Sequence, residues 1–261
     1  MVHFVGAGPG AEDLITVRGL RLLQQADVII YAGSLVNPGL LTAAKEGCII
    51  HNSAYMTLEE VIEVIAESEK AGRTTVRLHT GDPAIYGAIK EQMDELEKRQ
   101  IPYDVCPGVS ALFGAAASLK VEYTLPDVSQ SVIITRAEGR TLVPEGEQLA
   151  QLARHQSTMI LYLSSALAVK VKDELIAGGY PEDTPAAVVY KATWPEEKIV
   201  RTTLAKLPEA MEREQITKTA LILVGKVLDG AYSKSRLYDA SFTTEYRQGK
   251  NADGNKGNQS V

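Results

Sequence analysis

The chain has 261 residues, of which 45% are hydrophobic, and its formal net charge is −6. This length is sufficient for one large α/β domain or two smaller ones, of which we favour two. The acidic balance argues against nucleic acid or an anionic membrane as the main partner, although it allows a local basic pocket. We find no signal peptide, membrane-spanning run or transit segment, and therefore expect a cytoplasmic protein without a membrane partner.

The chain begins with a predicted strand, residues 3–5, that runs directly into the glycine loop Gly6–Gly10. Glycine lets the backbone turn sharply and lets a ligand approach it. A helix beginning near Asp13 would also direct free amide groups at that ligand. The loop therefore favours a ligand site, and the alternative is a tight strand-to-helix turn that binds nothing.

The spacing of Gly6, Gly8 and Ala11 also fits the glycine fingerprint of a nicotinamide or flavin site. In a dinucleotide fold, an acidic residue at the end of the second strand binds the ribose. Here the second predicted strand, residues 27–31, ends in Ala32 and has its only acidic residue at the opposite end. The sequence therefore disfavours a dinucleotide site and leaves a nicotinamide oxidoreductase as a weaker alternative.

Strands alternate with helices through the first predicted unit, residues 1–120. Such alternation is typical of a mostly parallel sheet with helices on both faces. After the first two strands we expect strands at 48–50, 74–78 and 103–105, and helices at 58–70, 85–98 and 109–119. The cysteines and histidines lack the spacing of a metal site, so we expect reduced thiols and no metal, with His79 an ordinary hydrogen-bonded histidine.

The segment 121–130 interrupts the alternation and is predicted to be a linker to a second unit, residues 131–230. We expect a mixed sheet there, because the strands near residues 190 and 200 suggest an antiparallel hairpin. The predicted strands are 131–135, 159–163, 186–190, 199–204 and 220–224, and the predicted helices are 147–154 and 166–177. Residues 231–261 form a tail, whose end at 249–261 is predicted to be disordered.

Three loops of the first unit follow predicted strands and combine glycine with proline: 6–10, 81–83 and 107–110. Ligands bind beyond the carboxyl ends of the strands in open α/β sheets, so we expect these loops to form one pocket. Asp82 could accept hydrogen bonds from a ribose or an ammonium group there, and a helix cap is the alternative. The pocket makes a non-enzymatic binding module the least favoured function.

The three loops occur in order with further motifs at 14–16, 25–27, Tyr162-Leu163 and 220–225. As a set they resemble the tetrapyrrole (corrin/porphyrin) methylase family over nearly the whole chain. The resemblance implies two α/β domains, with S-adenosylmethionine in the cleft between them. It also implies a homodimer and methyl transfer to a carbon of a tetrapyrrole substrate, with S-adenosylhomocysteine as the product.

The resemblance also implies which residues contact S-adenosylmethionine. In the first unit these are Pro9, Gly81, Asp82, Ile85, Tyr86, Ser110 and Ala111, and in the second they are Leu163, Ala192 and Leu221. Two other segments, Tyr31–Asn37 and Lys234–Tyr238, are most similar to the branch that methylates C-11 of precorrin-4 or cobalt-precorrin-4 in cobalamin biosynthesis. Methylation of another precorrin position, or of a diphthamide intermediate, is the alternative within the family.

The segment after the second strand departs from part of this family. Members that methylate uroporphyrinogen have an aspartate where this chain has Ala32. We therefore assign no catalytic base and disfavour uroporphyrinogen as the substrate. Transfer of a methyl group from a sulfonium needs mainly an in-line geometry, so we expect positioning to be the main catalytic device.

Precorrins carry several carboxylates, so an acidic protein that binds them needs local positive charge. The candidates near loop edges of the second unit are Arg136, Arg140, Lys191 and Lys198, of which Arg136 is our first choice. The alternative for each is a solvated surface charge. Trp194 could stack on the macrocycle, or it could pack as a hairpin tip against the core or a partner subunit.

Overall fold

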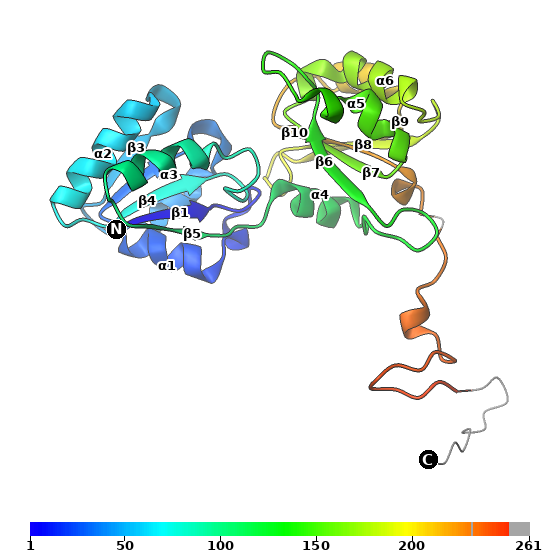
Figure 1. The fold of residues 1–261 in the computed structure, drawn as a ribbon, viewed down its shortest axis with the longest axis horizontal. Helices are drawn as coiled ribbons and strands as arrows, with labels where there is room; N and C mark the ends of the chain where they lie inside the picture. Colours follow the sequence, from blue (N-terminus) through cyan, green and yellow to red (C-terminus); the bar gives the residue numbers. More distant parts are fainter. Residues whose placement is uncertain (231, 251–261) are drawn as a thin grey trace.

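The computed structural model describes residues 1–230 and 232–250 of the chain (Figure 1). The described chain is built around two five-stranded sheets, and each has helices packed against it. The two sheets confirm the predicted α/β class with a parallel sheet first and a mixed sheet second. Of the segment predicted to be disordered, residues 251–261 lie outside the described residues.

The first sheet is parallel throughout and has the strand order β3-β2-β4-β1-β5. Its strands are β1 (Val2–Gly6), β2 (Val28–Tyr31), β3 (Ile49–Asn52), β4 (Thr75–His79) and β5 (Tyr103–Cys106). All five residues of the central strand β4 are buried, as expected for a parallel strand covered on both faces. All strands point the same way, so the loops after β1, β4 and β5 meet at one edge.

Three helices cover this sheet: α1 (Val17–Gln25), α2 (Leu58–Lys70) and α3 (Ile89–Lys98). The expected helix near Asp13 is wrong, because residues 12–14 form only a 3-10 turn and the Thr16 side chain caps α1. The predicted start of α3 at residue 85 is also wrong. Tyr86 and Ala88 adopt left-handed φ angles of 55° and 49°, which an α-helix cannot accommodate.

The second sheet is mixed and has the strand order β6-β7-β10-β8-β9. Its strands are β6 (Val132–Arg136), β7 (Thr158–Tyr162), β8 (Pro185–Tyr190), β9 (Lys198–Thr203) and β10 (Ala220–Val224). β6 and β7 are parallel, and every other neighbouring pair is antiparallel. The pairing of β8 with β9 confirms the predicted hairpin.

One face of the second sheet is covered by α5 (Leu149–Leu152), α6 (Ala168–Ala177) and α7 (Leu207–Arg213). The predicted helix at 147–154 contains a single α-helical turn between two 3-10 turns. We did not predict α7, whose seven residues are too few for a clear periodic pattern. Its Leu207, Ala210 and Met211 are nevertheless buried in the core.

The helix α4 (Ala111–Leu119) connects the two sheets in the chain and lies beside the second one (Figure 1). Its buried face, which includes Leu112, Ala115 and Leu119, packs against Ile160 of β7 and Leu221 of β10. The division of the chain at residues 121–130 stays a prediction. By its packing, however, α4 belongs with the second sheet rather than with the first unit.

Candidate functional site

A cavity of about 350 Å³ lies where the loops after β1, β4 and β5 meet the second sheet. This volume falls in the usual range of small-molecule sites. All ten positions that we expected to contact S-adenosylmethionine line it: Pro9, Gly81, Asp82, Ile85, Tyr86, Ser110, Ala111, Leu163, Ala192 and Leu221. The structure thus brings together residues from both units, and their individual roles in binding stay predictions.

The glycines in the three loops allow the loops to pack against one another. A Cβ on Gly6 would lie 2.5 Å from the Cα of Gly108 and 2.6 Å from the carbonyl oxygen of Gly81. Gly8 and Gly81 have positive φ angles and exchange two backbone hydrogen bonds of 3.2 and 2.8 Å. Close approach by a ligand therefore explains only part of the motif, since of these glycines Gly81 alone lines the cavity.

Asp82 ties two of these loops together. Its Oδ1 accepts a hydrogen bond of 2.8 Å from the Ala84 amide, and its Oδ2 accepts one of 2.8 Å from the Gly108 amide. No α-helix begins at Ala84, so the first contact closes a local turn rather than capping a helix. Asp82 therefore lines the cavity and also holds two of the loops that border it in place.

Tyr162 connects the second sheet to the start of α4. Its hydroxyl lies 2.8 Å from the Ser110 Oγ and accepts a hydrogen bond of 3.0 Å from the Leu112 amide. Burial raises the pKa of this phenol above its usual range. The ring centroid of Tyr86 lies 5.5 Å from that of Tyr162, so two aromatic rings border the cavity. Tyr162 was part of the family motif but not of our predicted site.

Trp194 joins the second unit to the glycine loop. Its indole Nε1–H donates a hydrogen bond of 3.1 Å to the Pro9 carbonyl, and a Cβ on Gly10 would lie 2.0 Å from its Cδ1. Beside it, Thr193 Oγ1 accepts a hydrogen bond of 3.0 Å from the Ala11 amide. Trp194 thus packs against the body of its own chain and also lines the cavity. Stacking on the macrocycle stays a prediction.

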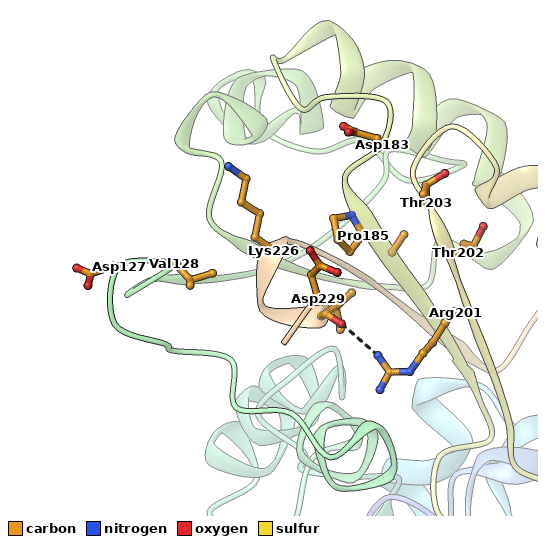
Figure 2. Close-up of a pocket in the computed structure, with 11 residues that line it drawn as sticks. Asp127, Val128, Asp183, Pro185, Arg201, Thr202, Thr203, Lys226 and Asp229 are labelled. Atoms are coloured by element: carbon orange, nitrogen blue, oxygen red, sulfur yellow. Dashed lines mark hydrogen bonds between the residues drawn. The ribbon is translucent and has the colours of Figure 1, made fainter. Parts of the chain in front are cut away.

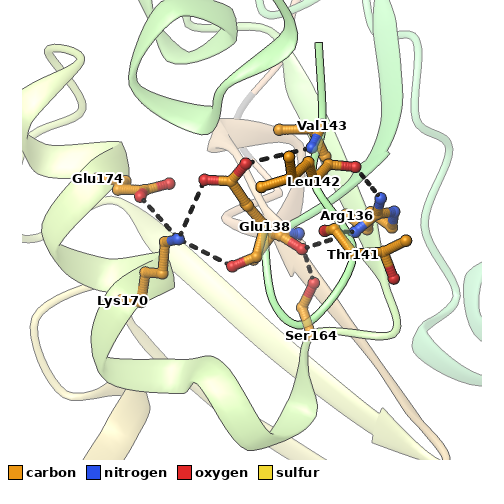
Figure 3. Close-up of polar contacts among 9 residues, drawn as sticks. Arg136, Glu138, Thr141, Leu142, Val143, Ser164, Lys170 and Glu174 are labelled. Carbon is orange, nitrogen blue, oxygen red and sulfur yellow. Dashed lines mark hydrogen bonds and ion pairs between the residues drawn. The ribbon is translucent and has the colours of Figure 1, made fainter. Parts of the chain in front are cut away.

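The structure does not place Arg136, our first choice for binding substrate carboxylates, among the residues that line the cavity. Its guanidinium donates hydrogen bonds to the carbonyls of Thr141 at 3.0 Å and Leu142 at 2.6 Å (Figure 3). In the same loop, residues 136–143, the Glu138 carboxylate accepts a hydrogen bond of 3.2 Å from the Val143 amide. Arg136 therefore binds carbonyls of its own loop through Nη1 and Nη2, contacts that its position in the sequence does not reveal. Burial raises the pKa of Tyr86, which lines the cavity, and the charge of Arg136 acts against this larger effect by lowering that pKa. The role of Arg136 in binding substrate stays a prediction.

Of the other cations that we considered, only Lys191 lines the cavity. Lys198 instead forms an ion pair of 3.8 Å with Glu214, and Arg140 is also outside the lining. Sequence reasoning missed several lining residues, which are Leu35, Thr80, Tyr162, Ser165, Ala166, Val189, Thr217, Lys218, Thr219 and Ala220. The three loops that the sequence singles out follow strands, whereas residues 217–219 precede one.

His79, at the end of β4, is not the ordinary hydrogen-bonded histidine that we expected. Its Nε2 is buried and has no hydrogen-bond partner among the described residues. Burial, with a smaller contribution from the Arg77 charge, lowers the pKa of His79 to about 3. Arg77 itself is buried, and its guanidinium donates to the Gln92 Oε1 at 3.0 Å and the Ile30 carbonyl at 3.1 Å. His79 is therefore neutral at physiological pH.

A second, larger cavity of about 630 Å³ lies at the other end of the second sheet (Figure 2). It is bordered by Pro185 at the start of β8 and Thr203 at the end of β9. Arg201 there donates to the carbonyls of Leu119 at 2.7 Å and Leu228 at 3.3 Å. No residue of our predicted site lines this cavity, so the smaller one is the candidate site.

Cys48 and Cys106 are not joined by a disulfide. Within residues 1–230 and 232–250, no group of three or more His, Cys, Asp or Glu side chains is arranged to hold a metal ion. Over the same ranges, none of the helices has the length and apolar character needed to cross a membrane.

Comparison with known proteins places these features in context. Residues 1–208 match the sequence model of the Tetrapyrrole (Corrin/Porphyrin) Methylases. The chain is 58% identical to a cobalt-precorrin-4 C(11)-methyltransferase from Methanocaldococcus jannaschii, covering 95% of this chain and 96% of the relative. It is 44% identical to a precorrin-4 C(11)-methyltransferase from Pseudomonas aeruginosa, with coverages of 95% and 99%.

Two solved structures are similar to this one. An X-ray structure of a cobalt-precorrin-4 methyltransferase superposes with a TM-score of 0.86 at 52% identity, covering 87% of this chain and 95% of the other. A uroporphyrin-III C-methyltransferase from Thermus thermophilus, complexed with S-adenosylhomocysteine, superposes with a TM-score of 0.75 at 25% identity, covering 88% and 99%.

Proposed function

Because the chain belongs to the tetrapyrrole (corrin/porphyrin) methylases, we propose that it transfers a methyl group from S-adenosylmethionine to C-11 of precorrin-4 or cobalt-precorrin-4 in cobalamin biosynthesis. The observation that carries this proposal is that one cavity is lined by all ten positions at which the family resemblance implies cofactor contacts. These positions run from Pro9 to Leu221, so their convergence is a property of the fold and not of one local motif.

The lining of the cavity fits S-adenosylmethionine. The aromatic rings of Tyr86 and Tyr162 suit a positively charged group, because an aromatic face attracts cations. The tightly packed loops offer backbone groups that are already fixed in place. When bound, the cofactor supplies an electrophilic methyl group on its sulfonium.

The residues of this chain contribute binding and orientation. Asp82 is the one carboxylate among the described lining residues, and both of its oxygens already accept backbone hydrogen bonds. We therefore assign no general base to this chain. The carbon–sulfur bond of the cofactor breaks as the new carbon–carbon bond forms, and the macrocycle then loses or redistributes a proton. Holding an electron-rich carbon in line with the methyl group supplies the rate enhancement.

Calorimetric titration of the purified protein with S-adenosylhomocysteine, beside NAD and NADP, tests cofactor class. We expect a dissociation constant of about 1 μM or below for the thioether, equivalent to about −8 kcal/mol, and no binding of either dinucleotide. Binding of a dinucleotide alone would overturn the proposal and favour an oxidoreductase. Methylation assays with precorrin-4 and cobalt-precorrin-4 then show which substrate is used, and product analysis tests C-11.

The assembly and location of the protein also belong to this proposal. We expect a homodimer, because the family resemblance implies one, and a cytoplasmic enzyme. Light scattering should then give twice the mass of one chain, and fractionation of the native cells should recover the protein with cytoplasmic markers. A monomeric mass, or recovery with membranes, would contradict the respective expectation.

A further inference from the structure

We propose that Lys191 and Lys218 act as a pair that binds carboxylates of the macrocycle at the candidate site. The inference rests on the proposed function for the identity of the macrocycle. On this proposal the lysine pair, rather than Arg136, is the principal ligand of the substrate carboxylates. The Arg136 guanidinium bonds to carbonyls of its own loop.

The loops that carry the two lysines lie side by side because β8 and β10 are antiparallel. Tyr190 at the end of β8 pairs with Ala220 at the start of β10, which places the next residue of one strand beside the preceding residues of the other. The Lys191 amide donates a hydrogen bond of 2.9 Å to the Thr219 carbonyl, which joins the two loops directly. Lys191 and Lys218 both line the cavity.

Both ammonium groups are available to an incoming anion. Lys218 is exposed, and no hydrogen bond or ion pair involves its side chain among the described residues. The Lys191 Nζ lies 3.4 Å from the Glu196 carboxylate, which is 62% exposed, and 5.0 Å from the centroid of the Trp194 ring. Exposed ion pairs of this kind contribute little, so a substrate carboxylate can replace Glu196 at small cost.

The backbone around the pair is strained in a way that favours a binding role. Lys191, Thr193 and Thr219 have left-handed φ angles of 47°, 69° and 55°. Such angles are costly for residues other than glycine and concentrate at ligand sites, where the surrounding structure maintains them. Here they occur in the two loops that present the lysines, while the register of β8 and β10 holds both loops in place.

The test is a fluorescence titration with cobalt-precorrin-4, a substrate of the proposed function, in the presence of saturating S-adenosylhomocysteine. The variants are Lys218→Gln, Lys191→Gln and Lys218→Arg, with Lys226→Gln as a matched control because Lys226 lines the other cavity. We expect each glutamine variant at the site to weaken macrocycle binding about tenfold, since a hydrogen bond to a charged group is lost. Lys218→Arg and Lys226→Gln should bind nearly as the wild type does.

Affinity for S-adenosylhomocysteine is measured on every variant, because both lysines line the cavity proposed for the cofactor. A loss of that affinity equal to the loss of macrocycle affinity would assign the lysines to the cofactor and overturn the lysine pair. Macrocycle affinities of the glutamine variants that equal that of Lys226→Gln would overturn the lysine pair. Failure of the wild type to bind cobalt-precorrin-4 would contradict the proposed substrate. An Arg136→Gln variant that loses more affinity than either lysine variant would overturn it in favour of Arg136. Failure of the wild type to bind the thioether would instead contradict the methyltransferase proposal, so the two failures are distinguishable.

Discussion

At the scale of single residues, two polar side chains at the end of β4 and in the loop after it differ in their hydrogen bonding. Asp82 uses both carboxylate oxygens, which accept the amides of Ala84 and Gly108. His79, three residues earlier, has a buried Nε2 without a partner among the described residues. The first group ties two loops together, and the second leads us to expect that the folded chain loses stability in acid.

Replacing Asp82 should loosen the loops that border the site. In Asp82→Ala both backbone amides lose their acceptor, and we expect affinity for S-adenosylhomocysteine to fall about tenfold, as for the loss of a charge-assisted hydrogen bond. Calorimetry measures this change, with Asp173→Ala, an exposed aspartate on α6, as the control. Equal affinities in the two variants would contradict a positioning role for Asp82.

Because His79 is buried, we expect the free energy of unfolding to fall in acid. Its pKa is about 3 in the folded chain and about 6.5 when unfolded, so between these values the unfolded state binds more protons. Stability is therefore lost as the pH falls below about 6.5, by about 1.4 kcal/mol per pH unit from this residue. Urea unfolding between about pH 4.5 and 7 should show a shallower dependence in His79→Leu than in the wild type.

The exposed His155 is the matched control for that measurement. His155→Leu makes the same substitution at an exposed position, so it controls for the replacement of a histidine by leucine. A His79→Leu variant whose pH dependence matches that of the wild type would show that His79 is not the source of the acid sensitivity.

At the scale of elements, the junction between the glycine loop and the β8–β9 connection holds the two units against each other. Trp194 fills the space beside Gly10, and its indole bonds to the Pro9 carbonyl. Thr193 adds a hydrogen bond from the Ala11 amide. These contacts cross the cavity edge, so both stability and binding depend on them.

A methyl group at position 10 should disturb this junction. In Gly10→Ala the new Cβ would meet the Trp194 Cδ1 at 2.0 Å, so the indole must move. We expect a loss of about 1–3 kcal/mol in the free energy of unfolding, typical of overpacking, together with weaker binding of S-adenosylhomocysteine. Urea unfolding measures the first effect, and calorimetry measures the second.

Gly146 provides a matched control, because a Cβ there would have no atom within 4 Å. Gly146→Ala should therefore leave both quantities close to the wild-type values. Similar losses in the two variants would show that the effect at Gly10 does not come from contact with Trp194.

At the scale of the whole molecule, the cavity lies where the first sheet and its helices meet the second sheet and its helices. α4 follows the first sheet in the chain but buries Leu112, Ala115 and Leu119 against the second. The chain therefore changes from one packed body to the other near residues 107–110, before α4 begins. The predicted linker at 121–130 begins only after this helix has already joined the second body.

Two fragments test this division. We expect residues 107–250 to fold with higher stability than residues 121–250, because only the longer fragment covers the sheet face over Ile160 and Leu221. Burying a leucine side chain stabilises a fold by about 1.5–3 kcal/mol, and α4 contributes two of them. Circular dichroism and urea unfolding measure both fragments, and equal stabilities would favour a boundary at 121–130.

The sequence predicted the features that depend on local pattern. Alternating apolar strands and helices indicated a parallel sheet, and the position of loops such as 81–83 after strands indicated a site at one edge. The start of α3 was wrong because left-handed angles at Tyr86 and Ala88 depend on tight packing, with Gly87 against Pro83. Local periodicity carries no information about such contacts.

By itself, then, the sequence determined the class of fold, the family motifs and the loops that follow parallel strands. Only the tertiary structure decided which cations reach the cavity. Arg136 follows a strand, but its guanidinium donates to nearby carbonyls and it is not among the residues that line the cavity. Lys218 precedes β10 and lines the cavity because that strand runs antiparallel to β8. The direction in which distant strands pair decides which strand end faces the cavity, and that direction is set by burial over the whole sheet rather than by neighbouring residues.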